Sequence, residues 1–417
     1  MKVDFINSDF LLETPLARIL YHEYVEGLPI ADYHNHLVPA ELASDRRFSD
    51  IGQLWVASDP YKHRAMRLHG ENEAVISGHA STREKFDAWA RTLPHTLGNP
   101  LFHWSAMEMK NVFGLDEMPD PSCADKVWDA CNERLKEDSF STMGILRGFG
   151  VKVLSTSDDL LDDVTVHSSV RGDIKVTPSL RADSVLGFAP AWLERLGSPK
   201  TLEEYLAAVD ARLDVFSENG CRVADHALDD GWRFVLTDFE TAAKLYAAAE
   251  FADVRLKSFV LGHLACEYSR RGWAMLLHIG AQRFTSSRLR SLAGPAGGYA
   301  SIGNTCDVKS LCAFLDSQDG VVGKVQFGPA WWYNDHFYGM TDQLENLAAY
   351  SLMPQFIGMT TDSRNVLSFS RHDYFRRILC NWLADKTLRG QFPADEAYLG
   401  HIAADISYNN ALKYFYE

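Results

Sequence analysis

The stretch IADYHNHL, residues 30–37, decides the fold class. It is the first of several short apolar runs, bounded by turn residues, that alternate along the chain with amphipathic helical stretches. Alternate residues of a strand share a face, so His34 and His36 should point the same way while Tyr33 and Asn35 point the other way. An alternation of strands and helices is typical of βα units and a parallel sheet.

Further runs of the same kind predict the rest of the sheet. We expect strands at Val151–Ser155, Ile174–Leu180, Cys221–Asp225, Trp273–Ile279, Gly323–Gly328 and Phe356–Thr361. Apolar residues three and four apart predict helices at Leu16–Val25, Leu202–Glu218, Val308–Leu315 and Phe375–Leu383. The fold class is therefore α/β, and the predicted architecture is a TIM-type (β/α)8 barrel.

The strand count is one short of the eight that such a barrel needs. The shortage lies within residues 280–323, where the stretch GGYASIG is the remaining candidate. Either this stretch conceals a strand, or one βα unit is absent from the chain.

More than a hundred residues separate the first two predicted strands, far more than one crossover needs. We expect residues 39–150 to form a helical insertion packed at the barrel mouth. Residues 1–38 and 151–417 then form the barrel catalytic domain. The insertion is rich in Trp, His and Met, which indicates a small core of its own.

Composition restricts the partners. The net charge of −15 opposes nucleic acids and anionic membranes as general partners, although local arginines can still bind a small anion. The N-terminus carries acidic residues where a signal peptide needs a basic start, and no apolar stretch of about 20 residues follows. The seven cysteines form no CxxC pair, and their odd number suits a reduced compartment. We expect a cytoplasmic protein, with assembly into a homo-oligomer left open.

Polar side chains at strand ends are the candidates for chemistry. The imidazoles of His34 and His36 can coordinate one divalent metal, but two histidines with separate hydrogen bonds in the core fit the spacing equally well. Asp362 follows the last predicted strand, where it would complete a metal site, act as a base or simply cap a helix. His278 ends another strand and would reach a metal or substrate oxygen, unless it is a buried histidine with its own hydrogen bonds.

Basic and aromatic groups supply the remaining candidates. Tyr61 and Arg64 lie in the run YKHRAMR, which offers a proton donor and anion contacts or forms a solvated helix face. Arg181 at a strand end can hold a carboxylate, or form an exposed ion pair. Trp331 and Trp332 offer flat surfaces to a sugar ring, although aromatic packing under a loop is more common.

Long segments of unusual composition resemble the uronate isomerases, also called glucuronate isomerases, of the amidohydrolase superfamily. They cover nearly the whole chain: DYHNHL, YKHRAMR, REKFDAWARTLPHTLGNPLFHW, CRVADHALD, RRGWAMLLHIGA, GKVQFGPAWWYND, MTTDSR and RHDYFRRILCNW. The resemblance implies a barrel of the metal-dependent hydrolase kind. It also implies the interconversion of D-glucuronate with D-fructuronate, and of D-galacturonate with D-tagaturonate.

The resemblance also assigns roles. It implies that His34, His36 and Asp362 surround one divalent metal, with zinc as the first expectation. His278 and Tyr61, with the arginines Arg64, Arg181 and Arg364, would line the substrate site. In the reaction that we expect, Asp362 moves the C2 proton, Tyr61 assists proton movement between the substrate oxygens, and arginines hold the C6 carboxylate.

The chain departs from the family pattern at two points. Pro60 stands where the family usually has a histidine before the tyrosine, and His63 is a candidate replacement. The chain is also shorter than the family norm near residues 181–190 and 316–323.

Two rival functions stay open at this point. One is a metal-dependent hydrolase of the same superfamily, although CRVADHALD lacks the bridging lysine that many such enzymes use. The other is a sugar-acid binding protein without turnover, for which Pro60 is the argument.

Overall fold

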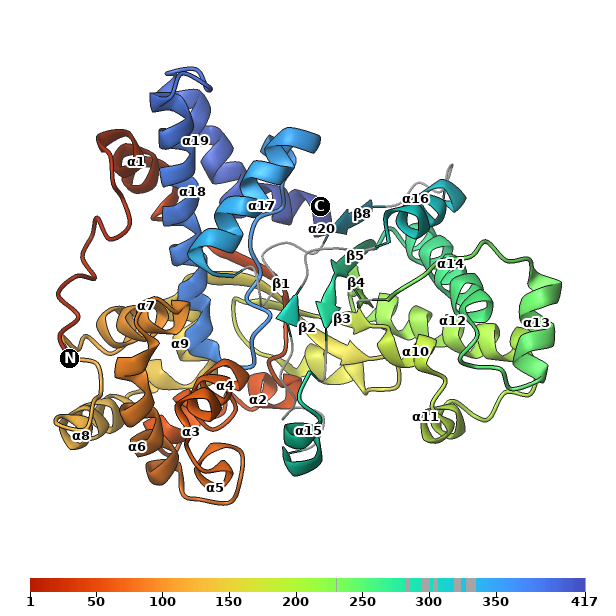
Figure 1. Cartoon of the computed structure of the whole chain (residues 1–417), viewed down its shortest axis with the longest axis horizontal. Helices are drawn as coiled ribbons and strands as arrows, with labels where there is room; N and C mark the ends of the chain where they lie inside the picture. Colours follow the sequence, from red (N-terminus) through yellow and green to blue (C-terminus); the bar gives the residue numbers. More distant parts are fainter. Residues whose placement is uncertain are drawn as a thin grey trace.

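The computed structural model describes residues 1–229, 231–282, 285–293, 301–302, 307–318, 324–327 and 335–416. Its centre is a six-stranded parallel sheet with the order β1-β2-β3-β4-β5-β8 (Figure 1). The strands are β1 Ile30–Asn35, β2 Val151–Asp159, β3 Lys175–Arg181, β4 Val223–Leu228, β5 Ala274–Ile279 and β8 Lys324–Phe327. Six of the predicted strands are therefore confirmed, and together they form a half-barrel whose strands all end at one edge.

The prediction of a strand at Phe356–Thr361 is wrong. The segment has no strand pairing there, although the chain just beyond it bonds to the end of β1: Asp362 N–H donates to His34 O (3.1 Å), and His36 N–H donates to Ser363 O (2.9 Å). Within the segment, the N–H of Thr361 donates to the carboxylate of Asp32 at 2.8 Å. A side chain of β1 thus takes the bond that a neighbouring strand would have provided.

The stretch GGYASIG does contain strand residues. Its Ser301 and Ile302 form β7 (Ser301–Ile302), which pairs antiparallel with β6 (Ala281–Gln282) in a separate two-stranded sheet. This antiparallel pair is separate from the six-stranded sheet, so it does not supply the missing strand of the barrel. The rest of the stretch lies outside the described residues.

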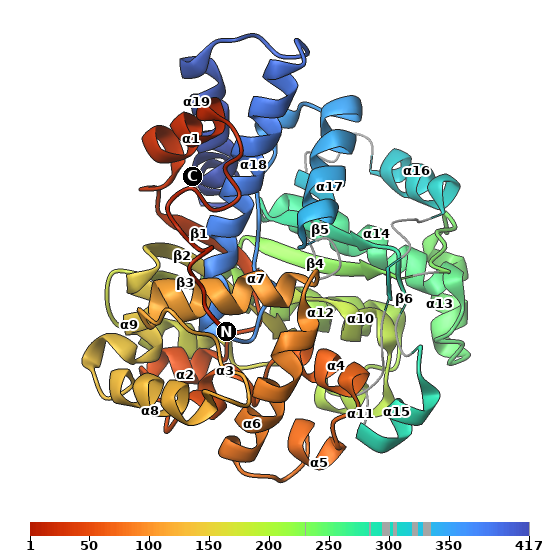
Figure 2. The ribbon, with the colours of Figure 1, turned by 60° about the vertical axis from the view of Figure 1, so that its left-hand side comes forward.

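Between β1 and β2 the chain is helical. Its α-helices are α2 Pro39–Ala43, α3 Ile51–Trp55, α4 Pro60–His69, α5 Glu73–Ile76, α6 Thr82–Thr92, α7 Pro100–Met107, α8 Ala124–Arg134 and α9 Thr142–Gly148. Side-chain caps explain where several of them begin: Asp59 accepts from the N–H groups of Tyr61 and Lys62. Ser81 and Glu84 form a capping box at α6. Figure 2 shows these helices below β1 and beside the long helix α18.

The remaining helices surround the sheet. They are α1 Pro15–Ile19, α10 Asp183–Gly187, α11 Pro190–Arg195, α12 Leu202–Glu218, α13 Phe239–Ala247, α14 Val254–Arg270, α15 Ser287–Ala293, α16 Val308–Ser317, α17 Phe337–Tyr350, α18 Ser370–Leu388, α19 Glu396–Ala404 and α20 Asn410–Phe415. A π-helical turn, η1 Leu20–Val25, continues α1. No helix in the described part of the chain has the length and apolarity needed to cross a bilayer.

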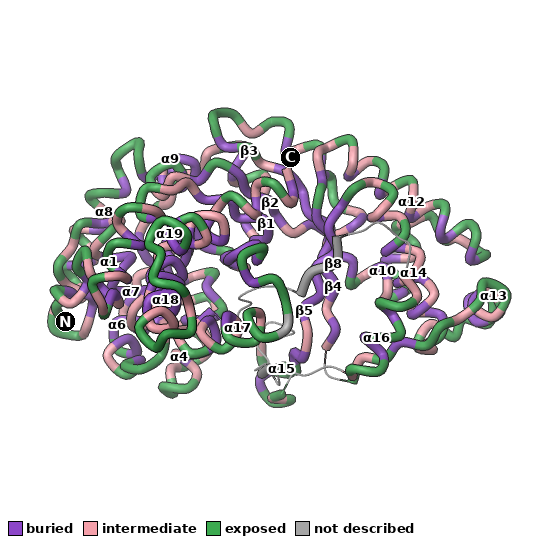
Figure 3. Tube along the Cα trace, turned by 90° about the horizontal axis from the view of Figure 1, so that it is seen from above, coloured by how far each residue is buried: buried purple, intermediate pink, exposed green. Residues whose placement is uncertain are grey.

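The core divides into two hydrophobic clusters that share the strands. On β5, Ala274 and Leu276 belong to the cluster that includes β1 and the helices before β2, whereas Met275 and Leu277 belong to the cluster of α12, α13 and α14. Alternate residues therefore face opposite sides, as a strand requires. Figure 3 shows the buried positions concentrated along the strands and α18. By the same alternation, His278 lies on the side of Ala274 and Leu276.

Candidate functional site

Asp362 joins the two histidines of the DYHNHL motif. One oxygen of its carboxylate, Oδ1, lies 3.1 Å from His34 Nε2 and 3.0 Å from His36 Nε2. His34 is the last but one residue of β1, and His36 follows the strand directly. Although burial opposes ionisation, the hydrogen bonds with His34 and His36 hold the pKa of Asp362 well below its usual value. The structure therefore brings together the three residues expected to hold a metal.

A buried network behind β1 positions Asp362. The carboxylate of Asp32 accepts from the N–H of Thr361 (2.8 Å) and lies 2.9 Å from His372 Nε2 on α18. The Thr360 hydroxyl donates to Asp32 and to the carbonyl of His34. Asp362 itself has φ +45°, in the left-handed region that is rare for residues other than glycine. Side chains from two elements thus impose the conformation that turns its carboxylate towards the histidines.

Asp225 is a site residue that the sequence reasoning missed. It lies on β4, is 0% exposed, and neither of its carboxylate oxygens has a hydrogen-bond partner among the described residues. Its Oδ1 lies 3.7 Å from His34 Nδ1, and its Oδ2 lies 3.9 Å from Arg181 Nη1. Strand alternation was the available signal, because Asp225 must face the same side as Val223, towards the site.

His278 and His226 point to opposite sides of the sheet. The His278 ring lies 5.2 Å from the His34 ring, and ligand atoms of His34, Asp225 and His278 all lie within 4.8 Å of one another. Burial lowers the pKa of His278 to about 4, so its imidazole is neutral at pH 7. His226, the next residue after Asp225, points the other way and lies 3.1 Å from the Tyr268 hydroxyl on α14. His226 therefore belongs to the core.

The donor set fits a divalent metal. Histidine nitrogens and a carboxylate oxygen of His34, His36 and Asp362 lie within 4.8 Å of one another. Two imidazoles and one carboxylate, with room for a further ligand, form a common catalytic zinc site. The Asp225 carboxylate beside this set is buried, has no hydrogen bond among the described residues and has Arg181 at 3.9 Å as a cationic neighbour, so a cation bound here would further offset the cost of its buried charge. Burial and donor chemistry together favour a cation here.

Arg181 lies at the end of β3, as predicted, and beside the same cluster. Its guanidinium contacts Asp183 at 3.1 Å and lies 3.5 Å from His36 Nε2. The side chain is 27% exposed. A guanidinium that is partly open to solvent at the rim of the cluster is suited to bind a substrate carboxylate.

Tyr61 belongs to a second buried group next to the cluster. Its hydroxyl donates to Asp335 Oδ2 at 3.1 Å, and Arg371 Nη1 donates to the same oxygen at 3.2 Å. Electrostatic interaction with Asp362 contributes to the pKa of both Tyr61 and Asp335, which places this group near the predicted base. Sequence reasoning missed Asp335 and Arg371, although both lie in segments that carry the family resemblance.

The other predicted residues have mixed outcomes. Arg64 is half-buried with its guanidinium 5.6 Å from the Tyr61 ring centroid, whereas Arg364 is exposed. Trp331 and Trp332 lie outside the described residues. Pro60 is exposed at the first position of α4, where its missing N–H costs no helical hydrogen bond. His63 Nε2 lies 2.9 Å from the carbonyl of Val56, so the backbone engages this ring nitrogen, and the replacement of the family histidine by His63 stays a prediction.

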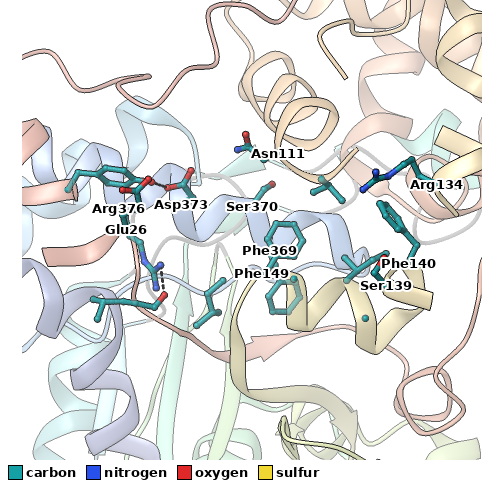
Figure 4. A pocket seen from close by; sticks show the side chains of 17 residues that line it. Glu26, Asn111, Arg134, Ser139, Phe140, Phe149, Phe369, Ser370, Asp373 and Arg376 are labelled. Atoms are coloured by element: carbon teal, nitrogen blue, oxygen red, sulfur yellow. Dashed lines mark hydrogen bonds between the residues drawn. The ribbon is translucent and has the colours of Figure 1, made fainter. Parts of the chain in front are cut away.

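A separate cavity of about 400 Å³ lies at the amino end of β1, between η1, α9 and α18 (Figure 4). Phe149 and Phe369 form an apolar wall, and Asp373 and Arg376 point in from α18. None of the predicted site residues lines this cavity. The candidate site lies elsewhere, at the carboxyl edge of the sheet, where enzymes with parallel strands have their active sites.

Comparisons with known proteins agree with this arrangement. The profile of the family described as glucuronate isomerase matches residues 1–322 and 317–415. The two matches overlap at residues 317–322, within the interval 316–323 where the chain is shorter than the family norm. A uronate isomerase of Marinomonas sp. (strain MWYL1) is 39% identical over 466 aligned positions, with 99% of each chain covered.

Solved structures give the same result. The uronate isomerase of Thermotoga maritima superposes with a TM-score of 0.92 at 27% identity, covering 99% of this chain and 100% of that chain. The glucuronate isomerase of Caulobacter crescentus shares the fold, with a TM-score of 0.89 at 22% identity and 99% and 97% coverage. The chain belongs to the glucuronate isomerase family.

Proposed function

We propose that the protein is a uronate isomerase that interconverts D-glucuronate with D-fructuronate, and D-galacturonate with D-tagaturonate. The observation that carries the proposal is the Asp362 carboxylate held by His34 and His36 at the carboxyl edge of the sheet. Family membership supports the same activity. The substrate is a small acidic sugar, which an acidic protein binds through local arginines.

The aldose must lose its C2 proton and gain one at C1. Asp362 removes the proton from C2 of the open-chain aldose, and a C1–C2 double bond forms while O1 takes up a proton. The protonated Asp362 then returns its proton to C1, and O2 loses its proton as the C2 carbonyl forms. No oxidant is required, because the two steps only redistribute protons and electron pairs within the substrate.

The other side chains bind and orient the sugar. Arg181 and Arg364, with Arg64, hold the C6 carboxylate through paired N–H donors. His278, neutral at pH 7, donates or accepts a hydrogen bond at a substrate oxygen. Trp331 and Trp332 give the sugar an apolar surface. Tyr61 transfers protons between O1 and O2.

We further propose that His34, His36 and Asp362 hold one zinc ion. A zinc ion bound there supplies Lewis-acid polarisation of substrate oxygens. The donor set of two imidazoles and a carboxylate supports zinc over magnesium or calcium, which prefer oxygen ligands alone.

The complete architecture is also a proposal. We infer that residues 1–38 and 151–417 form a closed (β/α)8 barrel with residues 39–150 as a helical insertion at its mouth. The TM-score of 0.92 to a uronate isomerase structure and the helices between β1 and β2 support this division. A cytoplasmic location and a homo-oligomer stay predictions.

The test is an incubation with D-glucuronate in D2O, with and without one equivalent of zinc, followed by proton NMR. Ketose signals should appear, with partial deuterium incorporation at the carbon that receives the proton. Absence of both ketose formation and C2 proton exchange would refute the isomerase. Saturable binding of glucuronate without either change would identify a sugar-acid binding protein instead.

A further inference from the structure

Three buried side chains from three segments meet around one carboxyl group. Tyr61 of α4 is 8% exposed, Asp335, which precedes α17, is 2% exposed, and Arg371 of α18 is 1% exposed. Tyr61 Oη and Arg371 Nη1 both bond to Asp335 Oδ2, at 3.1 and 3.2 Å. The Arg371 guanidinium also lies over the Tyr61 ring, 4.6 Å from its centroid.

The Arg371 side chain is itself fixed from other directions. Its guanidinium stacks 3.9 Å from the Trp104 ring centroid and donates to the carbonyl of Thr361 at 3.3 Å. Thr361 precedes Asp362, so one arginine connects the Tyr61–Asp335 pair to the segment that carries the proposed base. This arrangement holds the phenol oxygen in one place without the entropy loss of ordering it for each turnover.

The proposed reaction requires a proton transfer between the substrate oxygens that Tyr61 and Asp335 can carry out together. Isomerisation moves a proton from O2 to O1 in addition to the C2 to C1 transfer. Tyr61 has a single hydroxyl proton, and its only hydrogen bond in the described structure is to Asp335. A tyrosine that gives its proton to the substrate needs another proton immediately, because a buried phenolate is costly.

We propose that Asp335 is a positioning residue that holds the Tyr61 hydroxyl and exchanges a proton with it during the transfer from O2 to O1. The inference rests on the proposed isomerase function. In the first half, the hydrogen bond between the two side chains reverses: Tyr61 turns its hydroxyl proton towards O1 and transfers it, while the protonated Asp335 carboxyl donates its proton to the Tyr61 oxygen. In the second half, the O2 proton passes to Tyr61 and the Tyr61 proton returns to Asp335. Both side chains regain their starting state, and the net change is one proton moved from O2 to O1.

The electrostatics of the pair suit this exchange. Burial raises the pKa of Asp335 to about 7, against the opposing effect of Arg371, while the charge of Asp362 adds to the rise. The charged and titratable groups that interact with Asp335 include Tyr61 and Arg64 of α4, Arg371 and Tyr374 of α18, and Asp362. A carboxyl group with a pKa near 7 both gives and takes a proton readily at neutral pH.

A double-mutant cycle tests the inference on the zinc-loaded full chain. Asp335→Asn, Tyr61→Phe and the combined variant are assayed for kcat and KM with D-glucuronate, after thermal unfolding shows that each is folded. Asp335→Asn should lower kcat by about 10- to 100-fold with KM changed by less than about threefold, and Tyr61→Phe should lower kcat by at least about 100-fold. The double variant should be no more than about threefold slower than Tyr61→Phe, because Asp335 acts only through Tyr61.

Glu108→Gln is the matched control. Glu108 is another buried carboxyl group of the same region, 2% exposed, which accepts from Trp55 Nε1 at 2.5 Å and, in the described part of the chain, has no hydrogen bond with Tyr61. This variant should keep kcat within about twofold of the parent enzyme, and its effect should multiply with that of Tyr61→Phe.

A second variant covers the case in which Asp335→Asn does not fold. Asp335→Glu keeps a carboxyl group beside Tyr61 and should retain more activity than Tyr61→Phe. An Asp335→Asn enzyme with unchanged kcat, an Asp335→Glu enzyme as slow as Tyr61→Phe, or multiplicative losses in the double variant would each overturn the inference. If the parent enzyme itself converts no uronate, the proposed function fails instead.

Discussion

Replacing Asp362 by asparagine separates the chemistry of this position from its role in folding. The backbone of Asp362 has φ +45°, and its N–H donates to His34 O. Asparagine adopts this left-handed conformation readily and keeps the N–H, so the local structure should survive. The change removes the negative charge and the basic oxygen that face His34 and His36, and with them one carboxylate ligand of the proposed zinc site.

The expected magnitudes follow from that difference. Loss of a general base lowers kcat by about 10²–10⁴, which corresponds to about 3–5 kcal/mol in the activation barrier. The free energy of unfolding should also fall at neutral pH, because the hydrogen bonds with His34 and His36 that lower the pKa of Asp362 stabilise the folded state. Asp362→Ala should cost about 1–2 kcal/mol more, because alanine pays the full steric penalty of the left-handed conformation.

Rates come from ketose formation by proton NMR in D2O, and stability from urea unfolding. Asp373→Asn is the contrasting variant, because Asp373 lies at the amino end of β1 and bonds to Tyr21 and Arg377. It should lose about 1–2 kcal/mol of stability with kcat unchanged. An Asp362→Asn enzyme that keeps more than about a tenth of the parent kcat would refute the assignment of Asp362 as base.

Three further predictions concern the metal, the substrate carboxylate and pH. His34→Ala and His36→Ala should each reduce the bound zinc, measured by elemental analysis after dialysis, from one ion per chain to below about a tenth of an ion per chain. The core variant His226→Ala should keep its zinc. Zinc retained in both site variants would contradict the proposed ligand set. Arg181→Met should raise KM for D-glucuronate at least about tenfold while leaving zinc content unchanged, and an unaltered KM would remove Arg181 from carboxylate binding. Because burial raises the pKa of Asp335 to about 7 from 3.8, the folded state holds this proton longer than the unfolded chain. The stability of the parent protein relative to Asp335→Asn should therefore fall between pH 4 and pH 8, measured by urea unfolding, and a rise over that range would show that the sign is wrong.

Much of the fold could be predicted from local pattern. The helix Leu202–Glu218 has the predicted bounds, because its apolar spacing and the Thr201 cap are both local features. Six strands were found for the same reason: each is a short apolar run between turn residues. The proposed metal ligands were also accessible, since His34 and His36 share a strand face and Asp362 follows the last apolar run.

The residues that the sequence could not assign depend on partners far along the chain. Phe356–Thr361 has the apolar pattern of a strand. In the structure, however, the N–H of Thr361 donates to the carboxylate of Asp32, and no local sequence feature of either segment predicts this hydrogen bond. Asp335 gains its role from Tyr61 and Arg371, which lie 274 and 36 residues away.

The sequence by itself thus determined six of the strands, the helix Leu202–Glu218, the face of β1 that carries the histidines and the family of the chain. Only the tertiary structure decided that Asp225 is buried beside His34 with no hydrogen-bond partner among the residues described, and that Asp335 bonds to Tyr61. The physical reason is that secondary structure follows from interactions between near neighbours, whereas the protonation and orientation of a buried carboxyl group follow from the charges and donors that packing brings around it.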